Sequence, residues 1–117
     1  MPYQSVINVA KDISNMSDLE KKHVPVIHIA GTPKANEPFE VTVWLGEQMP
    51  HPMEAEHHIE FIDLYLDETF VARCDISWDH TYPKACFNIV MDQPGTLRAF
   101  ERCNIHGDWT YNMDVSF

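Results

Sequence analysis

The sequence predicts an all-β protein, an immunoglobulin-like antiparallel β-sandwich of about seven strands with a short N-terminal helical segment. Three observations lead to this fold class. Seven short runs are rich in β-branched and aromatic residues, clusters of turn-forming residues separate them, and only one segment has a helical pattern. Many short strands with almost no helix are typical of two sheets that enclose one core.

The helical pattern covers residues 14–22, SNMSDLEKK. Ser17 suits the N-cap position, and Glu20 stands three residues later, where the partner in a capping box belongs. We therefore expect a short helix that begins after Ser17 and leads into the first of the seven strands.

The seven runs after this helix have strand patterns. In the run 38–45, every second residue from Phe39 to Leu45 is apolar, as in an antiparallel strand with one buried face. The run 58–66 is apolar at both alternate sets of positions, so its period does not identify the core face. The predicted strands cover residues 24–30, 38–45, 58–66, 69–76, 84–91, 96–103 and 109–117.

Length and charge limit the classes of function. The 117 residues fit a single domain, 1–117, with one core. Lys and Arg number 8 against 18 Asp and Glu, a net charge of −10. This balance argues against nucleic acid or an anionic membrane as a partner, because both require a basic face. The sequence has neither a long apolar run nor a secretion signal pattern, so we expect a cytoplasmic protein.

The three cysteines do not form a disulfide framework, because their number is odd and no two stand in a CxxC pair. Cys74 and Cys86 lie within predicted strands, and we expect both to be small buried apolar residues. Cys103 differs from them, because it begins the segment CNIHGDW, which contains a histidine.

Histidines concentrate in the segment MPHPMEAEHH, residues 49–58. His51 stands between two prolines, which stiffen the backbone and prevent a regular helix. His57 and His58 should point to opposite faces of a strand, so we expect only His57 to join His51 in a site. His23 follows the predicted helix, and the remaining His28 and His80 are interpreted as solvated side chains.

The segment CNIHGDW places Cys103 and His106 three residues apart, followed by Gly107, which makes a turn between two strands easy. Thiolate and imidazole together suit iron, copper or zinc. A sandwich gathers its loops at its two ends, so these two side chains can meet His23, His51 and His57 at one end.

Three segments, EKKHVPVI, MPHPMEAEHHI and CNIHGDW, together resemble the signature blocks of the superoxide reductase family in its short one-iron form, also called neelaredoxin. They match in order and spacing over most of the chain. The longer relatives, the desulfoferrodoxins, have an additional rubredoxin-like domain with four cysteines. Nothing in this sequence could supply that domain, so we expect the one-iron form. The resemblance implies one non-haem iron per chain, Fe2+ or Fe3+, with four equatorial imidazoles and an axial thiolate. The ligands it implies are His23, His51, His57, His106 and Cys103.

The resemblance also implies an activity and partners. Members of the family reduce superoxide to hydrogen peroxide without releasing dioxygen. Rubredoxin or a similar small iron protein returns the electron. The resemblance also implies a symmetric assembly, so we expect a homo-oligomer, a tetramer by resemblance.

Two further positions carry an expected role. The family pattern before the first ligand is Glu-Lys-His, in which the lysine attracts superoxide and the glutamate can bind ferric iron. Here the residues are Glu20, Lys21, Lys22 and His23. Lys22 therefore matches the lysine, whereas Lys21 occupies the place of the glutamate. Glu20 can substitute only if the turn shifts by one residue, which rotates a helical side chain by roughly 100°.

Two other classes of function compete with this interpretation. A blue-copper-type electron-transfer protein is also a β-sandwich, and it would use Cys103, His106, an upstream His57 and a later Met113. That alternative leaves His23 and His51 without a role. A binding module without a metal treats all five candidate ligands as coincidence. Metal analysis distinguishes the three.

Overall fold

The computed structural model describes residues 7–117, and these residues form eight strands and one short helix. All seven predicted strands are confirmed, with ends that differ by one or two residues. The elements are β1 (Ile7–Asn8), α1 (Asp18–His23), β2 (Val26–Ile29), β3 (Phe39–Trp44), β4 (Ile59–Leu66), β5 (Thr69–Asp75), β6 (Lys84–Ile89), β7 (Gly95–Cys103) and β8 (Gly107–Val115).

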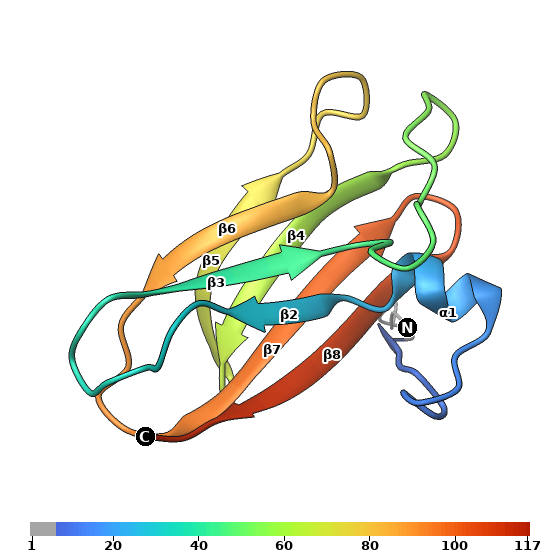
Figure 1. The fold of residues 1–117 in the computed structure, drawn as a ribbon. Helices are drawn as coiled ribbons and strands as arrows, with labels where there is room; N and C mark the ends of the chain where they lie inside the picture. Colours follow the sequence, from blue (N-terminus) through green and yellow to red (C-terminus); the bar gives the residue numbers. More distant parts are fainter. Residues whose placement is uncertain (1–6) are drawn as a thin grey trace, which may run out of the picture.

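The strands form two sheets that face each other, which confirms the predicted sandwich (Figure 1). The larger sheet has the order β1-β8-β7-β4-β5, and the smaller has the order β2-β3-β6. All neighbouring strands are antiparallel except β1, which pairs in parallel with β8. The sequence did not predict β1, because a strand of two residues is too short to show a period.

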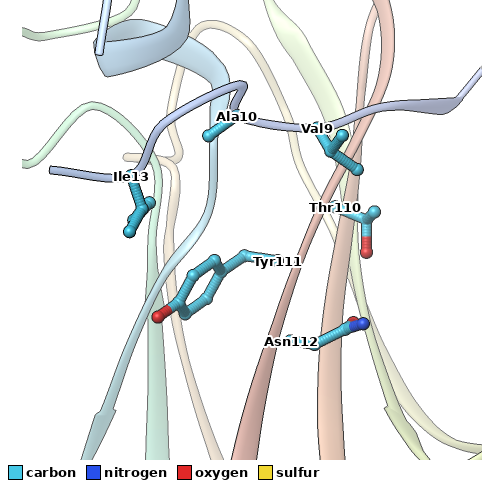
Figure 2. A pocket seen from close by; sticks show the side chains of 6 residues that line it. All are labelled: Val9, Ala10, Ile13, Thr110, Tyr111 and Asn112. Atoms are coloured by element: carbon cyan, nitrogen blue, oxygen red, sulfur yellow. The ribbon is translucent and has the colours of Figure 1, made fainter. Parts of the chain in front are cut away.

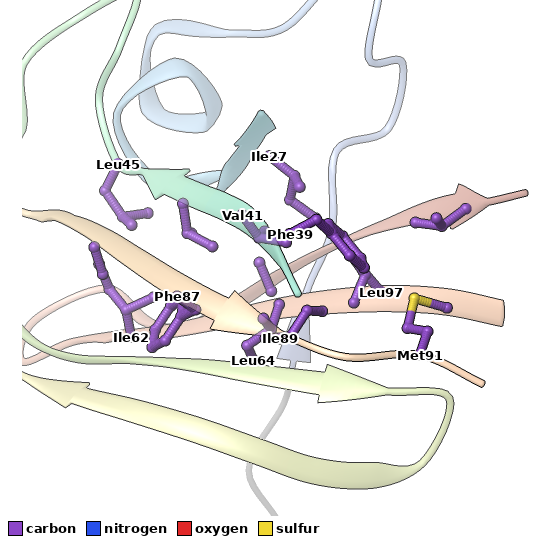
Figure 3. Close-up of a cluster of buried hydrophobic side chains, with 14 of the residues drawn as sticks. Ile27, Phe39, Val41, Leu45, Ile62, Leu64, Phe87, Ile89, Met91 and Leu97 are labelled. Carbon is purple, nitrogen blue, oxygen red and sulfur yellow. The ribbon is translucent and has the colours of Figure 1, made fainter. Parts of the chain in front are cut away.

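The core lies between the two sheets (Figure 3). The alternation predicted for the run 38–45 is confirmed, because Val41, Val43 and Leu45 are fully buried. Val41 and Leu45 face Ile62 and Leu64 of the larger sheet. Alternation along the strand thus fixes which residues meet across the sandwich.

An irregularity in β4 explains why its period is ambiguous. The register against β7 shifts between Ile59 and Phe61, so that Ile59 and Ile62 are both fully buried although they are three residues apart. Asp63 points to the other face of the sheet, where Arg73 covers it with two hydrogen bonds of 2.6 and 2.8 Å. A bulge of this kind moves later side chains to the opposite face.

The prediction that Cys86 is buried is wrong, because this side chain is exposed. Strand β6 places Ala85, Phe87 and Ile89 toward the core, and alternation leaves Cys86 on the outer face. Cys74 is half-buried and packs at the edge of the core.

Helix α1 has the predicted start. The Ser17 hydroxyl accepts a hydrogen bond from the Glu20 backbone N–H, and the Glu20 carboxylate accepts one from the Ser17 N–H, which confirms the capping box. The helix ends at His23 because Val24 precedes Pro25, and a residue before proline avoids helical backbone angles. None of the helices in the described residues is long and apolar enough to cross a membrane.

Candidate metal centre

Helix α1, the loop between β3 and β4, and the turn between β7 and β8 meet at one end of the sandwich (Figure 1). Four side chains gather there. They are His23, His51, His57 and Cys103, and each offers a donor atom within 4.8 Å of the others. His23 is the last residue of α1, and Cys103 is the last residue of β7. Residues 80 positions apart in the sequence thus share one site.

His106 closes a ring of four imidazoles. Ring centroids are 4.6 Å apart for His23 and His51, 4.7 Å for His51 and His57, 5.0 Å for His57 and His106, and 4.9 Å for His106 and His23. Neighbouring ring planes cross at 63° to 87°. Nδ1 of His106 lies 3.8 Å from Sγ of Cys103. All five ligands implied by the resemblance therefore lie together.

Backbone carbonyls fix the orientation of the two most buried rings. Nδ1–H of His23 donates to the Leu19 carbonyl at 2.7 Å, and Nδ1–H of His51 donates to the Pro52 carbonyl at 2.6 Å. A carbonyl can only accept, so both neutral imidazoles carry their proton on Nδ1 and present a bare Nε2. Such bonds to the second nitrogen are the usual way in which proteins orient metal-binding histidines.

The two bare nitrogens lie close to each other. Nε2 of His23 and Nε2 of His51 are 3.1 Å apart. With both protons on Nδ1, this contact cannot be a hydrogen bond, and two lone pairs face each other. Burial lowers the pKa of His23 and of His51 to about 4, against the opposing effect of their carbonyl bonds. Near neutral pH both Nε2 atoms therefore remain unprotonated, and a metal cation between them can bind both lone pairs.

Two more donors have the same character. Nε2 of His57 is buried and has no hydrogen-bond partner among the described residues. Cys103 is 1% exposed, and burial raises the pKa of its thiol. Its Sγ accepts hydrogen bonds from backbone N–H groups of the following turn, among them that of His106 at 3.4 Å. A cation that binds both groups removes an unsatisfied nitrogen and stabilises the thiolate.

The donor set favours some classes of metal site over others. Four imidazoles and one thiolate exceed the four ligands of a tetrahedral zinc site and the His2Cys set of blue copper. Met113, the axial ligand that the copper alternative requires, lies six residues from Gly107 along β8. At about 3.4 Å per residue it is about 20 Å away from the Cys103 end of the strand. The residues fit iron, and the copper alternative is not favoured.

Trp109 and Asn104 hold these ligands in place, although neither offers a donor atom to the metal site. Trp109 stacks on the His23 ring with centroids 5.0 Å apart, and its Nε1–H donates to the His106 carbonyl at 3.1 Å. Trp109 is 5% exposed. It therefore joins the end of α1 to the turn between β7 and β8.

Asn104 joins this turn to the segment that contains His57. Its side-chain oxygen accepts from the His58 N–H at 2.8 Å, and its amide donates to the Glu56 carbonyl at 2.9 Å. A backbone bond from Asn104 N–H to the His58 carbonyl, 3.1 Å long, completes the clamp. These bonds fix the position of His57 relative to Cys103.

The other predicted residues take distinct positions. Lys22 is half-exposed beside the site, and its charge adds to burial in lowering the pKa of both His23 and His57. The Glu20 carboxylate accepts from the backbone N–H groups of Ser17 and Lys11, each at 2.9 Å. These bonds hold the pKa of Glu20 below its usual value and direct the carboxylate into the cap of α1.

The remaining histidines do not join the ring. His58 donates from Nδ1 to the Glu54 carbonyl at 2.9 Å. His28 contacts Glu47, and His80 pairs with Asp79 at 3.0 Å. None of these three histidines belongs to the group of donor atoms that lie together in the described residues.

A separate pocket of about 210 Å³ lies between the N-terminal segment and β8 (Figure 2). Val9, Ala10 and Ile13 form one side of it, and Thr110, Tyr111 and Asn112 form the other. None of the lining residues is a candidate ligand.

Sequence reasoning assigned no role to Asn104, Trp109 or Glu101. Asn104 and Trp109 stand in the segment CNIHGDW, but their residue types alone do not predict the clamp that Asn104 forms or the stacking contact that Trp109 makes. Glu101 is fully buried, and both of its carboxyl oxygens lack a partner in the described part of the chain. Its position two residues before Cys103 in a strand places it on the same face, a signal that was available in the sequence.

The fold and the site together define a β-sandwich protein with a cluster of His and Cys side chains that suits a metal ion. The family model for desulfoferrodoxin matches residues 15–112. The chain belongs to this family.

Individual relatives agree with this assignment. A superoxide reductase from Pyrococcus abyssi is 38% identical over 104 residues, which cover 81% of this chain and 88% of the relative. A relative from Methanocaldococcus jannaschii is 37% identical over 105 residues, with 85% of this chain and 86% of the relative covered. The solved superoxide reductase (neelaredoxin) from Ignicoccus hospitalis superposes with a TM-score of 0.81 at 28% identity and covers 94% of both chains.

Proposed function

We propose that this protein is a superoxide reductase, which converts superoxide, one electron and two protons into hydrogen peroxide without forming dioxygen. The observation that carries this proposal is the ring of four imidazoles with a buried cysteine sulfur beside it. Relatives that bear the name superoxide reductase and match over four fifths of the chain support it.

We further propose that each chain holds one iron through His23, His51, His57, His106 and Cys103. When bound there, iron that cycles between Fe2+ and Fe3+ supplies one-electron chemistry, and the cysteine thiolate tunes its potential. The carbonyl bonds of His23 and His51 hold these rings in one tautomer, so they need no reorganisation when the charge of the site changes.

Exposure around the ring indicates the side from which substrate arrives. His23 and His51 are buried, whereas His106 is exposed and His57 is half-buried. Superoxide is a small anion that must approach a protein of net charge −10. Lys22 supplies a local positive charge at His23 and His57, and such a charge outweighs distant ones beyond a Debye length of about 8 Å. We therefore propose that Lys22 attracts superoxide.

Five protein ligands would leave a further position on the iron, which either Glu20 or solvent would fill. In the structure, both oxygens of the Glu20 carboxylate already accept backbone hydrogen bonds in the cap of α1. We propose that solvent occupies the position in the ferric protein and that Glu20 acts as a helix cap.

The remaining proposals concern the setting of the enzyme. The electron comes from rubredoxin or a similar small iron protein, and residues 1–117 act as one iron-binding domain within a homo-oligomer, a tetramer by resemblance. Cys74, Cys86 and Cys103 form no disulfide, which fits a reducing compartment and supports a cytoplasmic location.

The test is metal analysis of the purified protein combined with its visible spectrum and its reaction with superoxide. The proposal predicts about one iron per chain, a thiolate-to-iron charge-transfer band in the oxidised form, and consumption of superoxide by the reduced form. Stoichiometric copper, or iron-loaded protein that is inert toward superoxide, would contradict it.

A further inference from the structure

Gly46 lies near the start of the loop that carries His51, after β3 ends at Trp44 and immediately after Leu45. Its φ of +74° lies in the left-handed region that favours glycine. The chain then turns back over it, so that residues 49 to 51 lie directly against its α-carbon. This close approach makes Gly46 a candidate for controlling the position of His51.

The space beside Gly46 is filled by backbone atoms. A Cβ at this position would lie 2.7 Å from the His51 nitrogen, 2.8 Å from the Met49 carbonyl oxygen and 3.1 Å from the Pro50 α-carbon. Ordinary contact begins at 3.4 Å, so the His51 backbone would have to move by about 0.7 Å. That shift exceeds the tolerance of about 0.5 Å within which a functional site must hold its groups.

Neither side of this contact can yield easily. Leu45 is fully buried and its N–H donates to the Pro83 carbonyl at 2.9 Å, which anchors the end of β3. On the other side, prolines flank His51 and limit its backbone. Its ring is tied to the Pro52 carbonyl and lies 3.1 Å from Nε2 of His23.

From these contacts we infer that Gly46 is a positioning residue, which sets the place of the His51 imidazole by letting the loop lie against its α-carbon. This inference rests on the proposed iron site. It adds to that site a residue without any donor atom, whose contribution is the absence of a side chain.

Gly31 provides a matched control. It has nearly the same backbone angle, with φ of +68°, but a Cβ there meets nothing within 4 Å. Alanine at either position therefore suffers the same conformational strain, and only position 46 adds the collision. Asparagine tolerates positive φ better than alanine, so Gly46→Asn and Gly31→Asn form a second pair in which the strain is smaller.

The experiment measures Fe2+ affinity by competition with a chelator, together with the thermal stability of the metal-free proteins. Gly46→Ala and Gly46→Asn should bind iron about ten- to a hundred-fold more weakly, the usual effect of disturbing groups that orient ligands. Both Gly31 variants should bind as wild type does. The double variant Gly46→Ala/His51→Ala should bind no more weakly than His51→Ala alone, because both changes act through the same ligand.

Several results would overturn the inference. Equal iron affinity in wild type and Gly46→Ala would do so, as would additive losses in the double variant. Failure of both position-46 variants to fold, while both position-31 variants fold, would show that the contact supports the whole fold instead of one ligand. Failure of wild type itself to bind iron would instead refute the proposed function, so the two failures are distinguishable.

Discussion

Acidification of the metal-free protein should destabilise it through His23 and His51. Burial lowers the pKa of each to about 4, whereas an unfolded histidine has a pKa of 6.5. The unfolded state therefore binds more protons between these two values. Stability contributed by the neutral rings is complete above pH about 6.5 and is lost as the pH falls toward about 4.

The size of the effect follows from proton linkage. Between pH of about 7.5 and about 5.5, each of these histidines should reduce the free energy of unfolding by on the order of 1 kcal/mol, or about 2–3 kcal/mol together. Burial also lowers the pKa of His57, which adds a loss of the same sign. Glu101 acts in the opposite direction, because burial raises its pKa well above the usual value and favours the protonated folded state.

The measurement is urea unfolding of metal-free Glu101→Gln at several pH values, since this variant lacks the opposing carboxyl group. The free energy of unfolding should fall by about 2–3 kcal/mol over that range. In Glu101→Gln/His51→Gln about half of this loss should disappear. A free energy of unfolding that stays constant or rises on acidification would refute the assignment of neutral, buried imidazoles.

The other predictions concern single side chains around the ring. His57→Ala should lower iron content, whereas His58→Ala should leave it near wild type because its ring bonds to a backbone carbonyl elsewhere; the reverse order would contradict this arrangement. Lys22→Ala should slow the second-order reaction with superoxide about several-fold at low salt, with a loss that shrinks as ionic strength rises, and Lys21→Ala should do less. Equal rates for wild type and Lys22→Ala at low salt would remove the steering role. Glu20→Ala should leave the ferric spectrum and its pH dependence unchanged and should destabilise α1; a clear spectral shift would show that the carboxylate reaches the iron.

Much of the fold is readable from residue patterns because the responsible physics is local. Alternation in the run 38–45 depends only on the pleat of a strand, and the start of α1 depends on contacts between Ser17 and Glu20 three residues apart. The core face of β4 could not be predicted in this way, because its bulge is fixed by pairing with β7, about forty residues later. Local patterns do not report this pairing.

The same distinction between local and long-range information applies to the candidate site. Soft and borderline donors in three segments identify potential ligands, such as His23, His51 and Cys103, since residue type determines which atoms can bind a metal. Their orientation depends on features without a residue signature. The Leu19 carbonyl that fixes the His23 tautomer could belong to any residue at that helical position. Asn104 acquires its clamping role only when the segment containing His58 packs beside it, 46 residues away along the chain.

The central claim is that the ring of histidines and Cys103 hold an iron that reduces superoxide without dismutating it. The most direct measurement is the yield of products when reduced, iron-loaded protein meets a known amount of superoxide, with hydrogen peroxide and dioxygen quantified together. We predict one hydrogen peroxide for each superoxide consumed and no dioxygen, and loss of this reaction in Cys103→Ser with its fold retained. Dioxygen released in equal amount to hydrogen peroxide, or full activity in Cys103→Ser, would contradict the account.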